Sequence, residues 1–282
     1  MSTDSVTWKG FTFNTATHPA SPTASQPGLA PGYNQWMPEN VSVANENLQL
    51  TIQRNSKLHW QGQVVWAAAE AVLEQPVNYG IYYVTFKVTD KDGTPNWGIY
   101  DIDNGDKVDI NSIFGVFLYD AQGVNSGNPN CEIDFLELGF QGQPNNGSGW
   151  IGSQPNGPAL NNAQFAVQPW DLDSPNAPNF DMVHRIALDV KKIPSTGEVT
   201  IACNYADGAT PVKNYLAYGP YDSSNFPFDG ADTISYTTPS SQKAYVPELN
   251  DNMRLHINLW PYGGPSTNDP VYVQVTNLEV PS

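Results

Sequence analysis

Three acidic residues lie close together in the stretch 131–139 and are separated by apolar residues. Side chains alternate between the two faces of a β-strand, so Glu132 and Asp134 point to one face while the apolar residues point into a core. Glu137 is out of phase with this pair. A β-bulge near residues 135–136 would turn Glu137 back to the carboxylate face, and bulges recur next to active sites.

A pair of carboxyl groups about 5–5.5 Å apart can hydrolyse a glycosidic bond with retention of configuration. One group attacks the anomeric carbon as a carboxylate, and the other is protonated and gives its proton to the leaving oxygen. A third acid beside them separates the two roles, because a neighbouring negative charge raises the pKa of the group that is hardest to ionise. Solvated strand faces and cation sites carry the same spacing, so the motif alone leaves those alternatives open.

The composition indicates an all-β globular protein. Of the 282 residues, 39% are hydrophobic and only 14% are charged, with 23 Gly and 24 Pro at frequent turns. An aromatic content of 12% is too high for a disordered chain. The net charge of −16 should repel nucleic acids and anionic membranes, which favours a neutral substrate.

Cysteines, histidines and the start of the chain bring no further chemistry. Cys131 and Cys203 fit no metal-site spacing and are expected as buried thiols, or as one disulfide if their strands are neighbours. No apolar run reaches membrane-spanning length, and residues 1–4 lack the features of a signal peptide. The four histidines form no metal set by spacing, and no serine-nucleophile or phosphate-binding motif is present.

About a dozen short alternating runs, separated by turns, predict strands. These runs cover 6–13, 41–53, 64–73, 79–89, 113–119, 131–139, 184–190, 198–205, 253–260 and 271–280. Hairpins are expected at 45–47 and 194–197, and a Pro/Ser-rich loop at 14–32. Without an internal repeat or a domain linker, the pattern predicts a single β-sandwich over residues 1–282.

The motif and the strand order resemble glycoside hydrolase family 16, the jelly-roll glucanases and galactanases related to concanavalin-type lectins. Residues 132–137 match the bulged form of the catalytic motif, which is associated with laminarinases, agarases and carrageenases. Stretches 79–87, 183–208 and 255–264 also resemble family segments. The resemblance implies a concanavalin-type jelly roll of two antiparallel sheets.

The resemblance also implies roles for individual residues. Glu132 would be the nucleophile, Glu137 the general acid/base, and Asp134 the residue that holds and tunes Glu132. His184 and Asn258 carry over as neighbours in the cleft. The residues by themselves do not show which glutamate has which role.

One departure from the family concerns sugar binding. The family usually has tryptophans in the strand before the catalytic one. The corresponding residues of this chain, 114–119, include no tryptophan. Other aromatic rings would then have to stack on the apolar C–H faces of the sugars. The candidates lie in or beside loops near the predicted concave face, with core packing as the alternative for each: Trp97, Tyr100, Trp150, Trp260 and Tyr262.

Together these features predict a retaining endo-glycosidase for a β-linked neutral polysaccharide, with β-1,3- or mixed-linked glucan ahead of galactans. A non-catalytic carbohydrate-binding protein on the same scaffold and a transglycosylase are the alternatives. No cofactor is expected to be required, and a structural calcium ion on the convex side is compatible with the resemblance. We expect a monomer that binds polysaccharide or oligosaccharide, and the resemblance implies an extracellular or periplasmic location.

Overall fold

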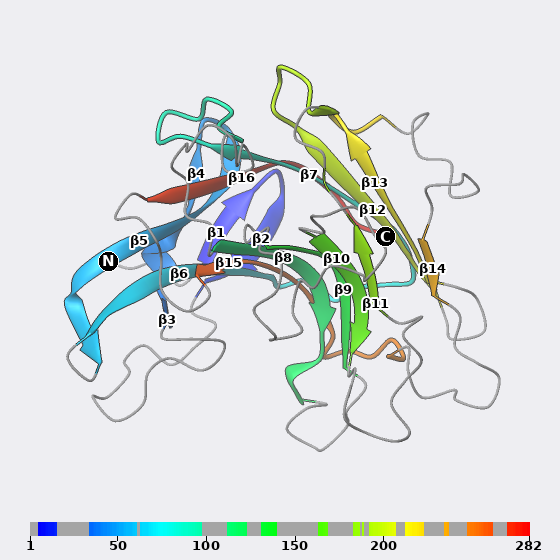
Figure 1. Cartoon of the computed structure of the whole chain (residues 1–282). Coiled ribbons are helices and arrows are strands. Elements are labelled where there is room, and N and C mark those ends of the chain that lie inside the picture. Colours follow the sequence, from blue (N-terminus) through cyan, green and yellow to red (C-terminus); the bar gives the residue numbers. More distant parts are fainter. Residues whose placement is uncertain are drawn as a thin grey trace.

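The protein is a sandwich of two curved layers of β-strands (Figure 1). The computed structural model describes residues 5–15, 34–60, 63–97, 112–122, 131–139, 163–168, 183–186, 188, 192–206, 212–222, 234–236, 247–261 and 270–282. The expected fold, an all-β jelly roll of antiparallel sheets, is confirmed. None of the described residues forms a helix that is long and apolar enough to cross a membrane.

The first layer has the strand order β11-β10-β9-β8-β15-β6, with β2 pairing with β6 and β1 pairing with β2. Its strands are β1 (Ser5–Trp8), β2 (Phe11–Asn14), β6 (Gln63–Leu73), β8 (Ser112–Tyr119), β9 (Glu132–Gly139), β10 (Ala163–Gln168), β11 (Val183–Ile186) and β15 (Arg254–Pro261). The short strand β3 (Asn34–Trp36) pairs with β6 in parallel, whereas the other described pairs are antiparallel.

The second layer has the order β5-β16-β7-β12-β13-β14, with β4 beside β5. Its strands are β4 (Val41–Ala44), β5 (Asn47–Trp60), β7 (Gly80–Thr89), β12 (Val199–Tyr205), β13 (Val212–Tyr218), β14 (Ile234–Tyr236) and β16 (Val271–Glu279), and a 3-10 turn η1 (Pro38–Asn40) precedes β4. The long strands β5 and β6 pair with each other, so they connect the two layers.

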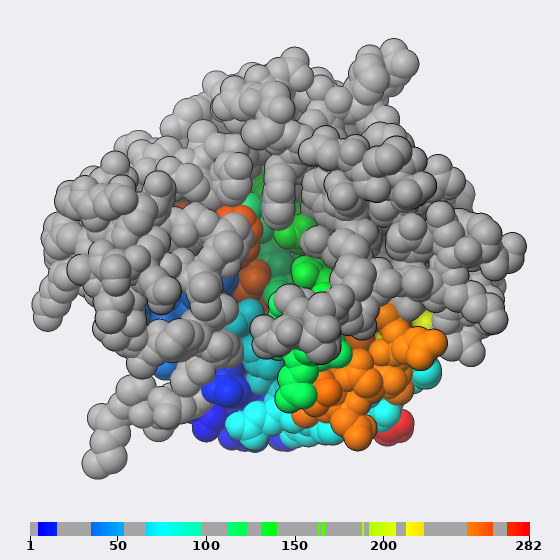
Figure 2. Space-filling view, turned by 90° about the horizontal axis from the view of Figure 1, so that it is seen from below, coloured from blue at the N-terminus to red at the C-terminus, as the bar shows by residue number. Residues whose placement is uncertain are grey.

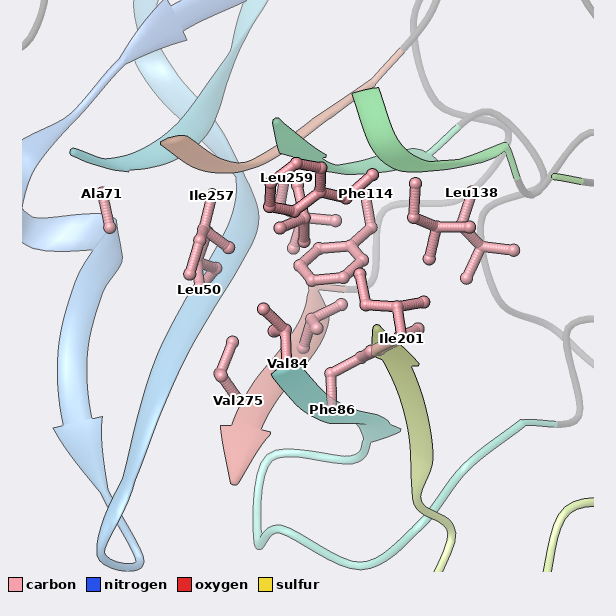
Figure 3. Close-up of a cluster of buried hydrophobic side chains, with 14 of the residues drawn as sticks. Leu50, Ala71, Val84, Phe86, Phe114, Leu138, Ile201, Ile257, Leu259 and Val275 are labelled. Atoms are coloured by element: carbon pink, nitrogen blue, oxygen red, sulfur yellow. The ribbon is translucent and has the colours of Figure 1, made fainter. Parts of the chain in front are cut away.

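Alternation of side chains builds the core between the layers. In β15, Leu255, Ile257 and Leu259 are buried in the main hydrophobic cluster, while the residues between them face away from it. Figure 3 shows aliphatic and aromatic side chains of both layers meeting in this core. Packing of the two layers therefore fixes which face of each first-layer strand is turned outward.

Two turn predictions have different outcomes. The hairpin at 45–47 is confirmed, because Asn45 and Glu46 take positive φ angles of 52° and 65° between β4 and β5, as a tight hairpin turn requires. The prediction of a hairpin at 194–197 is wrong. Gly197 does close a turn onto Pro194, but β11 pairs with β10 in the first layer and β12 pairs with β7 and β13 in the second.

The prediction of a single strand over residues 6–13 is also corrected. This stretch forms a hairpin of β1 and β2, because Lys9 and Gly10 take positive φ angles of 49° and 84° and reverse the chain. Cys131 and Cys203 are buried and form no disulfide with each other, so buried thiols are the correct one of the two expectations. Most of the predicted loop at 14–32 lies outside the described residues.

Candidate active site

The β-bulge in β9 places the three acidic residues on one face of the first layer. Alternate residues of β8 lie opposite them: Tyr119 opposite Glu132, Phe117 opposite Asp134, and Gly115 opposite Glu137. Phe135 is the extra residue, because the register shifts between Val116 and Phe117 of β8. Residues directly opposite each other in an antiparallel ladder share a face. The bulge predicted from the sequence is therefore confirmed.

The carboxylate face is the outer face of the first layer. Phe114, Val116 and Leu118 of β8 point into the core, so the residues between them point away from it. Figure 2 views the molecule from this side, where green and orange-red atoms are visible, the colours of β8, β9 and β15. The acidic residues thus belong to strands whose outer face is turned to this side of the molecule.

Burial gives one acid of this group unusual protonation behaviour. Asp134 is only 1% exposed, and Glu132 and Glu137 are partly buried. Loss of hydration on burial raises the pKa of Glu132 from 4.5 to about 7, against the lowering effect of its hydrogen bond with Asp134. The negative charges of Glu137 and Glu70 raise this pKa further. The group of acids therefore holds a proton close to neutral pH.

Two other groups beside Glu132 remain protonated. Burial raises the pKa of the Cys131 thiol to about 11, and the Glu132 charge adds to the effect. Burial also raises the pKa of the Tyr119 hydroxyl, with smaller contributions from Cys131 and Glu132. A thiol with such a raised pKa is a poor nucleophile, so the chemistry of this face belongs to the carboxyl groups.

A buried acid–imidazole pair extends the site across β15 to β6. Nδ1 of His256 lies 3.1 Å from Oε1 of Glu70, and the two side chains are 12% and 7% exposed. The imidazole stacks on Phe117 with ring centroids 5.0 Å apart and meets the Tyr119 ring edge-on at 5.5 Å. Sequence analysis missed this pair. The one local signal is Glu70 itself, a single acid in the otherwise apolar run 66–73.

Asn258 lies in the same row of the ladder as Glu137. It pairs with Gly115, which in turn pairs with Glu137, and on its other side it pairs with Glu70. Its Oδ1 is buried and has no hydrogen-bond partner among the described residues. A Cβ atom on Gly115 would lie 2.6 Å from this oxygen, so the row has room only for glycine beside Asn258.

The structure places two predicted sugar-binding tryptophans away from an open surface. Trp97 is 6% exposed, packs against Phe86 with ring centroids 6.0 Å apart, and donates its Nε1 hydrogen to the carbonyl of Gly197 at 2.6 Å. It belongs to the core between the layers, which was the alternative for this residue. Trp260 is 3% exposed and packs in a small apolar cluster with Trp36, on the carboxylate face but covered.

The remaining predicted residues are described in part or not at all. Tyr100, Trp150 and Tyr262 lie outside the described residues. His184 lies in β11 opposite Phe165 of β10, and its side chain lies outside the description. Within the part of the chain that the structure describes, no group of three or more His, Cys, Asp or Glu side chains is arranged to hold a metal ion.

Comparisons with known proteins gave structural similarities alone. No protein-family model and no curated protein matches the chain. The structure is similar to those of LamAcat from Zobellia galactanivorans (14% identity, 87% of this chain and 81% of that chain, TM-score 0.46) and the β-glucanase of Bacillus licheniformis (15%, 86% and 83%, 0.49). It is also similar to a laminarinase catalytic domain from Thermotoga petrophila (15%, 86% and 81%, 0.47).

Identities of about 15% and TM-scores below 0.5 carry no conclusion about activity. The candidate function is therefore inferred from the carboxylate face itself.

Proposed function

We propose that the protein is a retaining endo-glycosidase that hydrolyses a β-linked neutral polysaccharide. The observation that carries this proposal is the bulge at Phe135, which brings Glu132, Asp134 and Glu137 to one face. Retaining hydrolysis needs two carboxyl groups about 5–5.5 Å apart that flank the scissile bond, one ionised and one protonated. The raised pKa of Glu132 supports the presence of such a retained proton.

In the proposed reaction, the carboxylate of Glu132 attacks the anomeric carbon while Glu137 gives its proton to the leaving glycosidic oxygen. The first step breaks the glycosidic bond and forms an ester between the sugar and Glu132. Glu137, now ionised, takes a proton from water, and the resulting hydroxide breaks that ester. Both carboxyl groups return to their starting states.

The assignment of Glu132 as nucleophile and Glu137 as general acid/base comes from the resemblance. The pKa of Glu132 has to be compatible with that assignment. A nucleophile must be ionised, but burial raises the pKa of Glu132 to about 7. Neighbouring acids that interact this strongly titrate as a group, so the retained proton is shared among them. The hydrogen bond between Asp134 and Glu132 lowers the pKa of Glu132, which fits a residue that prepares Glu132 for attack. We expect activity to increase as the pH rises towards 7.

A neutral substrate fits the charge of the site better than a sulfated one. Glu70 adds a fourth carboxyl group to the same face as the three acids of β9, and the whole chain carries a net charge of −16. A polyanion would be repelled at this surface. Together with the sequence resemblance, this favours β-1,3- or mixed-linked glucan ahead of sulfated galactans.

No cofactor is required by this chemistry, because carboxyl groups supply both the nucleophile and the proton. We accordingly expect activity to persist after dialysis against a chelator. A structural calcium ion would instead be detected as a lower melting temperature after the same treatment. We also propose that the protein is a monomer and that it is located outside the cell or in the periplasm.

The test is release of reducing sugar from laminarin, lichenan, agarose, carrageenan and xyloglucan. Wild-type protein, Glu132→Gln and Glu137→Gln are compared, with Glu74→Gln as a control because Glu74 is exposed outside the site. We expect hydrolysis of laminarin or lichenan by the wild type and the control, and a loss of about 10³-fold or more in both site variants. A fully active Glu132→Gln variant would refute the proposal.

One observation favours the alternative of binding without turnover. Trp97 and Trp260 are buried, so neither offers an open ring for stacking on a sugar. A carbohydrate-binding protein would retain oligosaccharide in calorimetry and release it unchanged. A transglycosylase would be distinguished by products longer than the added oligosaccharide.

A further inference from the structure

The bulge at Phe135 locally disrupts the ladder of β9, so contacts from outside the first layer can add to what holds it in one register. Two residues of the second layer reach it across the sandwich. They are Tyr82 in β7 and Asn214 in β13, and both are fully buried. Tyr82 and Asn214 both pair with Cys203 of β12, on opposite sides, so the three residues form one row facing the core.

Asn214 binds the backbone of the site directly. Its Nδ2 donates a hydrogen bond to the carbonyl oxygen of Asp134 at 3.4 Å, and Asp134 immediately precedes the bulged residue Phe135. Oδ1 of Asn214 has no hydrogen-bond partner among the described residues. A buried amide with one group unsatisfied is less stable than an apolar side chain of the same size. Packing alone therefore does not explain an asparagine at this position.

Tyr82 contacts the bulged residue itself. Its ring lies against the Phe135 ring with centroids 5.1 Å apart and the ring planes tilted by 49°. The hydroxyl of Tyr82 donates a hydrogen bond to the carbonyl of Asn78 at 2.5 Å and accepts one from the Asn78 amide at 3.1 Å. Because these bonds fix the far end of the ring, Tyr82 gives Phe135 a rigid surface to pack on.

We propose that Asn214 and Tyr82 are positioning residues that hold the bulge at Phe135, and so keep Asp134 and Glu137 on the same face as Glu132. Asn214 binds the carbonyl before the extra residue, and Tyr82 packs on the side chain of the extra residue. Their effect on catalysis rests on the proposed function, whereas their hold on the bulge does not depend on it.

The test replaces Asn214 by leucine, which has a similar volume and no hydrogen-bond donor. The matched control is Thr200→Val, because Thr200 is buried in the same layer but bonds to Thr85 and Gly219. The readout is a pH titration of the Glu132 carboxyl group by carbon-13 NMR. This group is sensitive to the bulge because the hydrogen bond between the Glu132 and Asp134 side chains lowers the pKa of Glu132.

We expect Asn214→Leu to raise the titration midpoint of Glu132 by about half a pH unit or more, as the hydrogen bond between Glu132 and Asp134 weakens. Thr200→Val should leave the midpoint unchanged even if it lowers the melting temperature. Equal midpoints in wild type and folded Asn214→Leu would overturn the proposal, and so would equal shifts in both variants. If Asn214→Leu does not fold, Asn214→Ser, which is smaller and cannot reach Asp134, is titrated in its place.

Activity gives a second and separable readout. On the glucan that the wild type hydrolyses, Asn214→Leu should lower kcat about tenfold or more with little change in KM, because it disturbs the reacting groups and not the sugar contacts. A wild type without activity would contradict the proposed function, but the titration would still decide whether Asn214 holds the bulge.

Discussion

Glu132 should make the folded protein less stable as the pH rises, and glutamine in its place should remove this loss. The ordinary pKa of the side chain is 4.5, and burial raises the pKa in the folded protein to about 7. Between these values the folded state binds a proton that the unfolded chain has released, so the free energy of unfolding falls with increasing pH. At about 1.36 kcal/mol for each pH unit, the loss is about 3 kcal/mol and is complete above pH 7.

Urea denaturation of wild type and Glu132→Gln at two pH values measures this effect. Near pH 4.5 we expect the two proteins to agree within about 0.5 kcal/mol, because both carry a neutral side chain of the same size at this position when folded. Near pH 8 we expect the variant to be more stable by about 3 kcal/mol, since it has no charge to bury. The difference between the two pH values is the quantity that tests the reasoning.

Glu74→Gln serves as the control, because Glu74 is an exposed carboxylate at the end of β6 and its replacement should give no such difference. If Glu132→Gln raised the free energy of unfolding equally at both pH values, its effect would be due to packing. If Glu132→Gln were no more stable than the wild type near pH 8, the conclusion that burial raises the pKa of Glu132 would be refuted. Both outcomes would also remove the support that the raised pKa gives to the proposed catalytic site.

Three further changes test the surroundings of the acids. Gly115→Ala should lower the free energy of unfolding by about 1–3 kcal/mol, because its Cβ would lie 2.6 Å from Oδ1 of Asn258. Adding Asn258→Ala should restore most of that stability in a denaturation experiment, and an unchanged loss would contradict the clash. His256→Leu should cost about 3–5 kcal/mol, since it removes the imidazole bound to Glu70, and the double variant with Glu70→Gln should cost less. Glu70→Gln alone should lower the pKa of Glu132 in an NMR titration, because the charge of Glu70 raises it; a higher pKa would contradict this assignment.

The central strand of the site could be predicted because its information is local. Alternation in β9 fails at one place, and a single extra residue corrects the phase of Glu137. Apolar residues next to polar ones likewise predict most strand positions, since each strand buries one face. The hairpin of β4 and β5 was predictable for the same reason, because the turn residues lie within the run itself.

Local patterns do not determine which layer a strand joins. Residues 194–197 do form a turn, as expected, but the turn leads from the first layer to the second instead of pairing β11 with β12. Trp97 shows the same limit. It follows β7 near a turn, and only the packing of Phe86 and the carbonyl of Gly197 100 residues away bring it into the core.

The least predictable part of the site is what controls its acids. Glu70 and His256 are 186 residues apart, and Asn214 lies 80 residues from the Asp134 carbonyl that it binds. Both contacts depend on strand order, because β6 and β15 are neighbours in one layer and β13 lies across the core from β9. A motif in one strand can therefore identify the acids, but their protonation and their common orientation depend on the whole sandwich. For this reason Asn214→Leu and Glu70→Gln, which leave the motif intact, are expected to change the behaviour of Glu132.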